Sequence, residues 1–171
     1  NIKYILSCLD RNYVSEIHDK IMVNSPDVTI LYLPYDDDNH QNLWKKNDDK
    51  ILIIKYTNST VDCDRLLQQF NIYKNKPLIE IGYHFINQAV DSNKNILVHC
   101  MAGVSRSVSV VAYYLMKKKA LSYEDALNII KQKRKIARPN DSFRSQLKLY
   151  QVLRDQFTES HANNIILQYS I

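Results

Sequence analysis

The chain reads ILVHCMAGVSRS from Ile96 to Ser107, and this stretch decides the fold. An apolar run typical of a buried strand leads into Cys100, and after five further residues Arg106 begins a run with helical apolar spacing. A short loop that enters a helix N-terminus turns its backbone N–H groups inward, and together with the helix dipole these groups bind anions. The stretch therefore predicts a strand, a phosphate-binding loop and a helix, in that order.

The residues of this loop suit nucleophilic chemistry on a phosphate. The positive field at the loop lowers the pKa of a cysteine at its entrance, so we expect Cys100 to be largely thiolate at neutral pH. Arg106 offers a planar fork that matches two phosphate oxygens, and Gly103 stands where a side chain would obstruct the turn or the anion. A cysteine on a buried strand is more often a small core residue. Here His99, Gly103, Arg106 and Ser107 all agree with the nucleophilic interpretation, which we therefore favour.

The composition excludes several classes of protein. Only 2 of the 171 residues are glycine, which excludes collagen-like and flexible-linker sequences, and the 45% apolar and 24% charged content is typical of one globular domain. No apolar run is long enough to cross a membrane. The three cysteines (Cys8, Cys63 and Cys100) have no paired spacing, so we expect a reducing compartment, cytoplasmic and/or nuclear. The net charge of +5 favours anionic partners.

Working outward from the loop, short apolar strands alternate with helical patterns, which predicts an α/β fold with a mostly parallel central sheet of about four to five strands flanked by helices. We expect a single domain over residues 1–171 with an insertion at about 45–76. Residues 51–54 are too apolar for a free loop, so this insertion should add an edge strand or a hairpin. The expected strands are 2–6, 28–33, 50–56 and 95–99, the last of them buried, and the expected helices are 13–22, 62–70, 77–90, 107–119, 122–134 and 141–156.

The segment His99–Ser107 resembles the active-site loop of the dual-specificity protein phosphatases, the cysteine-dependent group that includes the MAP-kinase phosphatases. Residues 122–126 and 139–150, which include Pro139, Asn140, Phe143 and Gln146, are similar to the last two helices of that family. Residues 2–7 resemble its strand before the acid loop. The resemblance covers about 1–43 and 77–155 and implies the cysteine-dependent phosphatase fold.

The resemblance also implies a mechanism. The Cys100 thiolate would attack phosphorus to form a cysteinyl-phosphate, and an aspartate would protonate the leaving oxygen and then activate water. Ser107 would hydrogen-bond the sulfur, while His99 would orient the loop from behind. No metal or other cofactor is expected. The residues expected to hold the phosphate are Met101, Ala102, Gly103, Val104, Ser105 and Arg106.

Two positions remain open for the aspartate. In the family the acid follows a hydrophobic-x-Pro-x-x-Asp segment, and Leu33-Pro34-Tyr-Asp-Asp37 fits that pattern. The distance from Asp37 to Cys100 exceeds the family's spacing by about the length of the block 45–76. The alternative makes 50–56 the strand that bears the acid, with Asp62 or Asp64 as the acid and a smaller anomaly in spacing. We favour Asp37, because only its segment carries the proline.

The loop residues 101–105 are uncharged, which by resemblance favours a phosphoprotein over a phosphoinositide or an RNA 5′-triphosphate. We therefore expect a protein phosphatase acting on phosphotyrosine and phosphoserine/threonine, with no nucleic-acid partner. The alternatives are a catalytically weak phospho-binding module on the same fold or a phosphatase acting on non-protein phosphates. A nucleic-acid-binding domain, suggested by charge alone, has no recognised motif to support it. The basic segment 131–138 is either a solvated helix face or a surface that attracts an acidic or multiply phosphorylated partner.

Overall fold

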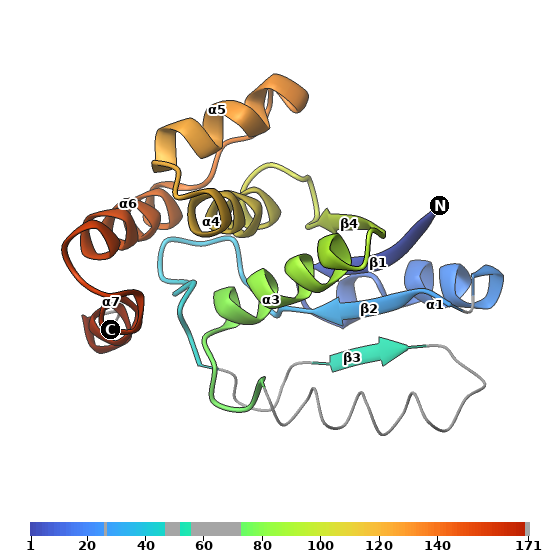
Figure 1. The fold of residues 1–171 in the computed structure, drawn as a ribbon. Helices are drawn as coiled ribbons and strands as arrows, with labels where there is room; N and C mark the ends of the chain where they lie inside the picture. The colour runs from blue at the N-terminus through green and yellow to red at the C-terminus, as the bar shows by residue number, and fades with distance from the viewer. Residues whose placement is uncertain (26, 47–51, 56–72, 170–171) are drawn as a thin grey trace.

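The structure is a computed structural model that describes residues 1–25, 27–46, 52–55 and 73–169 (Figure 1). Its elements are those of an α/β protein, as the sequence predicts. The strands are β1 (Ile2–Ser7), β2 (Thr29–Tyr32), β3 (Leu52–Lys55) and β4 (Asn95–His99). The helices are the 3-10 turn η1 (Arg11–Tyr13), α1 (Ser15–Asn24), α3 (Leu78–Asp91), α4 (Arg106–Lys119), α5 (Tyr123–Lys133), α6 (Asp141–Gln156) and α7 (Glu159–Tyr169).

The four strands form one sheet in the order β3-β2-β1-β4. β1 lies in the middle and runs parallel to both of its neighbours, whereas β3 pairs antiparallel with β2 at the edge. Ser7 at the end of β1 is opposite Tyr32 of β2 and His99 of β4. The loops that follow the three parallel strands therefore all begin at the carboxyl ends of these strands, on the side of the sheet where α/β proteins bind their ligands.

Alternate strand residues serve two separate cores, because successive side chains point to opposite faces of a sheet. Ile5 and Ile30 pack with Met22 of α1 on one face. Leu6 and Leu31 belong to the larger core on the other face, which α3 and α4 cover (Figure 1). This arrangement explains why the central strands read as continuous apolar runs.

β4 differs from its expectation. The sequence predicts a buried strand over 95–99, but β4 lies at an edge of the described sheet and its residues are exposed or half-buried, with Leu97 40% exposed. The apolar residues of a strand do not reveal whether a second neighbour covers it. The strand expected over 50–56 forms as the edge strand β3, while the helix expected over 62–70 and Cys63 lie outside the described residues.

Helix boundaries follow the capping signals. Ser122 caps α5 by accepting the Asp125 N–H at 3.1 Å, which confirms the serine half of the capping box predicted for residues 122–125. The Asp125 carboxylate accepts from the Ser122 hydroxyl, whereas in a full capping box it would accept from the Ser122 backbone N–H. Asn140 caps α6 by accepting the Phe143 N–H at 2.8 Å. Pro77, expected as the first helical residue, instead occupies the capping position just before α3.

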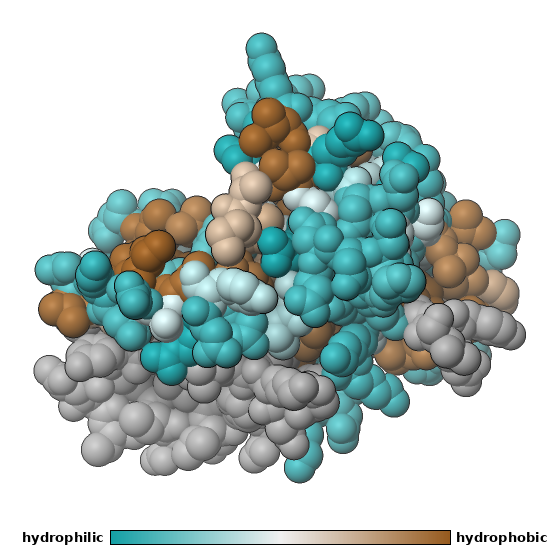
Figure 2. Space-filling model, turned by 180° about the vertical axis from the view of Figure 1, so that it is seen from behind, coloured by the Kyte–Doolittle hydropathy of each residue, from teal (hydrophilic) through white to brown (hydrophobic). Residues whose placement is uncertain are grey.

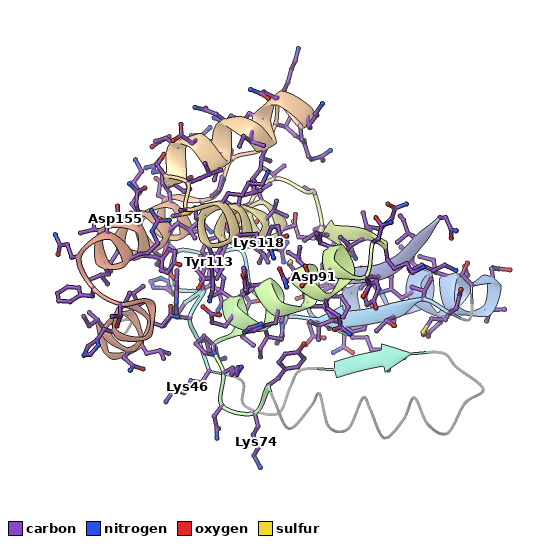
Figure 3. All side chains as sticks on the ribbon, in the orientation of Figure 1. Lys46, Lys74, Asp91, Tyr113, Lys118 and Asp155 are labelled. Carbon is purple, nitrogen blue, oxygen red and sulfur yellow. The ribbon has the colours of Figure 1, made fainter. Side chains whose placement is uncertain are left out.

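Buried polar groups connect α3, α4 and α7. Glu80 of α3 accepts hydrogen bonds from Lys117 Nζ at 2.7 and 2.9 Å, from Asn163 Nδ2 at 3.0 Å and from the Tyr113 hydroxyl. Figure 3 labels Tyr113 near this junction, and Lys118 and Asp91, which form an ion pair at 3.6 Å between α4 and α3. Asn163 also accepts from the indole N–H of the buried Trp44, so α7 is fixed to the core.

On the face seen from behind, the described residues are mainly hydrophilic, and the hydrophobic ones gather in a few separate patches (Figure 2). None of the helices described combines the length and apolar character that crossing a bilayer demands.

Candidate active site

The predicted strand-loop-helix unit forms over β4, residues 100–105 and α4, with the loop connecting the two elements (Figure 1). Gly103 has a φ of +63°, in the left-handed region that costs other residues energy. A Cβ at this position would also stand 3.0–3.2 Å from the guanidinium of Arg134. The backbone conformation therefore favours glycine in the middle of the loop, and a Cβ there would also displace the Arg134 side chain.

Cys100 lies at the start of this loop with its sulfur largely buried. Burial alone would raise the pKa of its thiol, but hydrogen bonds from the Ser107 side chain and from the backbone N–H groups of Ser107, Gly103 and Val104 outweigh burial and lower it. The sulfur is 3.3 Å from the Ser107 hydroxyl oxygen. The site can therefore hold a thiolate, the form in which cysteine is a nucleophile.

Arg106 begins α4, and its side chain turns toward the loop that follows β2. One of its terminal N–H groups donates to the Tyr35 carbonyl at 3.3 Å, and its Nε lies 3.6 Å from Asp37 Oδ2. That Nε is buried and has no hydrogen-bond partner among the described residues. This N–H is thus a donor whose hydrogen bond the described residues leave unfilled.

Asp37 reaches the site from a distant part of the chain. β2 ends at Tyr32, and the buried Tyr35 anchors the following loop by donating its hydroxyl to the Leu43 carbonyl at 2.8 Å. The Asp37 side chain is 34% exposed and approaches Arg106. The structure therefore brings Asp37 together with Arg106, whereas the alternatives Asp62 and Asp64 lie outside the described residues.

The family model of the dual specificity phosphatase catalytic domain matches residues 1–152. The chain belongs to this family. It is 54% identical over 165 residues to the putative tyrosine-protein phosphatase R622 of Acanthamoeba polyphaga mimivirus, covering 96% of this chain and 78% of that protein. It is 47% identical over 80 residues to human protein phosphatase Slingshot homolog 1, covering 47% of this chain but 8% of that protein.

Solved structures agree with this fold. The crystal structure of DUSP15 superposes with a TM-score of 0.57 at 22% identity, covering 98% of this chain and 79% of that one. The crystal structure of human DUSP28 gives 0.56 at 21% identity, covering 91% and 81%. The expected α/β phosphatase fold is confirmed, and the chain is a protein phosphatase of the dual specificity family.

Two residues of this phosphatase site were not predicted as site residues. Arg134, just after α5, donates to the carbonyls of Gly103 at 2.6 Å and Ala102 at 2.8 Å. Asn140 donates its backbone N–H to Ser105 Oγ at 3.1 Å and its side-chain amide to Asp37 Oδ1 at 3.0 Å. The signal for Asn140 was its place directly before a helix, which predicts a cap but not a partner some hundred residues earlier.

His99 lies behind the loop of this phosphatase and packs against a second histidine. Its ring meets His18 edge to face at 5.2 Å, and His18 Nδ1 is 2.6 Å from the Tyr32 hydroxyl. Burial lowers the pKa of His99, and burial together with the nearby His99 lowers the pKa of His18 to about 4. Both rings are therefore neutral at physiological pH, which suits the supporting role predicted for His99.

The remaining loop residues frame the site. Met101 is exposed to solvent. The carbonyls of Ala102 and Gly103 accept hydrogen bonds from the Arg134 side chain, and the Val104 carbonyl accepts the Arg138 backbone N–H at 2.8 Å. A hollow of about 430 Å³ lies against the loop between β4, α4 and α5, and Cys100 and Arg134 line it while Asp37 and Arg106 do not. No three His, Cys, Asp or Glu side chains gather as metal ligands in the part of the chain that is described.

Proposed function

We propose that this chain hydrolyses phosphotyrosine and phosphoserine/threonine in proteins through a covalent phosphate on Cys100. The observation that carries the proposal is the approach of Asp37 to Arg106, 3.6 Å apart, where Arg106 follows the loop that begins at Cys100, a thiol whose pKa is lowered. A nucleophile, an anion-binding arginine and a proton donor are the three groups that the hydrolysis of a phosphate ester requires.

In the first step the Cys100 thiolate attacks phosphorus, the S–P bond forms and the bond from phosphorus to the leaving oxygen breaks. Asp37 transfers its proton to that oxygen, so the leaving group departs as a neutral phenol or alcohol. Arg106 and the backbone N–H groups of residues 101–106 donate to the three equatorial oxygens, whose charge is spread in the transition state.

In the second step water attacks the cysteinyl-phosphate. Asp37, now a carboxylate, accepts a proton from the water as the P–O bond forms and the S–P bond breaks. The Ser107 hydroxyl, 3.3 Å from the sulfur, donates to the departing thiolate. Phosphate leaves, and both Cys100 and Asp37 return to their starting states.

The proposal extends to the setting of the enzyme. Residues 1–171 act as one catalytic domain with an insertion at about 45–76, and the natural partner is a phosphorylated protein. A nucleophilic thiolate needs a reducing compartment, cytoplasmic or nuclear, because a low-pKa thiol is readily oxidised. Cys8 and Cys100 are both free thiols in the structure, which supports this setting.

The test is a set of variants assayed under reducing conditions on p-nitrophenyl phosphate and on phosphotyrosine and phosphothreonine peptides. Cys100→Ser should abolish turnover, and Asp37→Ala should lower kcat/KM for the peptides by roughly 100-fold, the scale of a positioned general acid. Asp36→Ala is the matched control, because that exposed neighbour has no side-chain contact to Arg106.

Three outcomes would contradict the proposal. Turnover that survives in Cys100→Ser would exclude a cysteinyl-phosphate. A loss of rate in Asp62→Ala or Asp64→Ala, with Asp37→Ala unaffected, would move the acid to the insertion. A protein that binds the phosphopeptides but never releases phosphate would be a phospho-binding module.

A further inference from the structure

Asn140 contacts three parts of the site at once. Its side-chain oxygen accepts the Phe143 N–H at 2.8 Å and so caps α6, and its backbone N–H donates to Ser105 of the phosphate loop. Its side-chain NH₂ donates to Asp37 Oδ1 at 3.0 Å and to the Asp38 carbonyl at 3.3 Å. Because the cap requires an acceptor, the amide oxygen must face α6 and the NH₂ must face Asp37, so chemistry fixes the orientation of the amide.

The Asp37 carboxyl is thereby held from two sides. Oδ1 accepts from Asn140, and Oδ2 lies 3.6 Å from Arg106 Nε, on the side where Arg106 would hold a phosphate. The Asp37 side chain is partly exposed, and among the described residues Asn140 and Arg106 are the groups that hold its rotamer. Oδ1 is therefore engaged by Asn140, and Oδ2 is the oxygen on the side of Arg106.

A neutral amide suits this position better than a cation would. Protonated on Oδ2, the acid still presents Oδ1 as an acceptor, and ionised it presents the same oxygen. The Arg106 guanidinium already lies beside Oδ2, and a second cation in place of the amide would favour the carboxylate over the acid still further. The Asn140 amide can therefore orient Asp37 in both steps of the cycle, first as a proton donor and then as a base.

The amide is itself fixed by the start of α6. Two turns into this helix, Gln146 donates to the Gln41 carbonyl at 2.9 Å and accepts the Leu43 N–H at 2.8 Å. The cap and the first two turns of α6 thus hold the loop of Asp37 at residues 37–38 and again at residues 41–43. Rigid support of this kind is what a proton donor needs, because its effect depends on distance and angle to the leaving oxygen.

We infer that Asn140 is a positioning residue for proton transfer by Asp37. The inference rests on the proposed function, in which Asp37 is the acid. Loss of the amide should slow the reaction in proportion to the need of the leaving group for a proton. A phosphotyrosine peptide, whose leaving phenol has a pKa of about 10, needs protonation. An activated ester such as difluoromethylumbelliferyl phosphate has a far more acidic leaving group and hardly needs it.

The experiment compares Asn140→Ser with wild type on these two substrates. Serine keeps a capping oxygen for α6 but has no NH₂ to reach Asp37. We expect kcat/KM for the phosphotyrosine peptide to fall about tenfold, part of the roughly 10²–10⁴ that a positioned acid supplies, and that for the activated ester to fall less than about twofold. The value of kcat/KM reports the attack by Cys100 whichever step limits turnover. Ser122→Ala, which removes the cap of α5, is the control for general loss of helix stability.

The double variant with Asp37→Ala separates this inference from the proposed function. If Asn140 acts through Asp37, then Asn140→Ser should cost nothing further once Asp37 is alanine. Equal losses on both substrates, no loss on either, or an undiminished loss in the double variant would overturn the inference while leaving Asp37 as the acid. If Asp37→Ala itself shows no dependence on the leaving group, the acid assignment fails first and this inference fails with it.

Discussion

Replacing Gly103 with alanine tests how the phosphate loop is built. An alanine here would have to keep the left-handed conformation of Gly103, which destabilises a residue with a Cβ by about 1–2 kcal/mol. Its Cβ would also stand 3.0 Å from the nearest guanidinium nitrogen of Arg134, tighter than most real Cβ contacts, so that the guanidinium would have to shift. Arg134 is an exposed, flexible side chain, so it should give way and lose its hydrogen bonds to Ala102 and Gly103, each worth about 0.5–1.5 kcal/mol.

These terms together predict a loss of roughly 2–5 kcal/mol in the free energy of unfolding if the loop keeps its shape. For a chain of this length that loss corresponds to a fall in Tm of roughly 5–15 °C. A loop that relaxes instead would keep stability but misdirect the Gly103 and Val104 N–H groups that lower the pKa of Cys100. Binding of vanadate, an anion that occupies phosphate sites, would then weaken.

Thermal unfolding and vanadate inhibition are the two assays, with Arg134→Ala as the matched variant. Arg134→Ala removes the two hydrogen bonds but leaves the backbone unstrained, so it should lose only their share of the stability, about 1–3 kcal/mol. Combined with Gly103→Ala it should add little, because the bonds are already broken there. A Gly103→Ala protein with the Tm and the vanadate affinity of wild type would refute this account of the loop.

Three further predictions follow from buried groups. In Ser107→Ala the pH midpoint for alkylation of Cys100 by iodoacetamide should move upward, because a hydrogen bond that favours the thiolate is lost; an unchanged midpoint would contradict the role of the hydroxyl. Lys117→Met leaves Glu80 buried without its cation, so urea denaturation should show a loss of about 3–5 kcal/mol, and a loss below about 1 kcal/mol would count against a buried ion pair. His18 has a pKa of about 4 in the folded protein against about 6.5 in the unfolded chain, so the unfolded chain binds the proton more readily. The free energy of unfolding should therefore fall as the pH drops from about 6.5 to about 4. Denaturation curves of His18→Gln should show a smaller dependence on pH over this range.

Local features of the fold could be predicted because they depend on neighbouring residues. Apolar, β-branched runs predicted the positions of the four strands, with bounds within about two residues of those observed, and Ser122 predicted the start of α5. The exposure of β4 could not be predicted in this way, because whether a strand is central or at an edge depends on pairing with distant segments. The same limit applies to α7, whose attachment through Asn163 depends on Trp44 and Glu80.

In the candidate site, too, contacts between residues close in the sequence could be predicted, whereas contacts between distant residues could not. The loop from His99 to Ser107 is continuous in sequence, and the contact of Cys100 with Ser107 follows from their places on either side of one turn. Asp37 was favoured from a proline three residues earlier, and the structure places it next to Arg106, while its role as the acid stays a prediction. Arg134 binds Gly103, which is 31 residues earlier, and Asn140 binds Asp37, which is 103 residues earlier, so only a folded structure identifies these contacts.

The central place of β1 has a consequence for when the enzyme becomes reactive. Ile2 lies opposite Asn95, so the sheet cannot gain β4, and the loop that follows β4 cannot be fixed, until the first strand and the fourth have met across about half of the chain. Closing so long a loop is slow, because its entropy is lost before the contacts compensate. Until then the Cys100 thiol has the ordinary reactivity of a cysteine in an unfolded peptide. A nascent or partly unfolded chain therefore carries no activated nucleophile, and thiol reactivity at this one position reports the completion of folding.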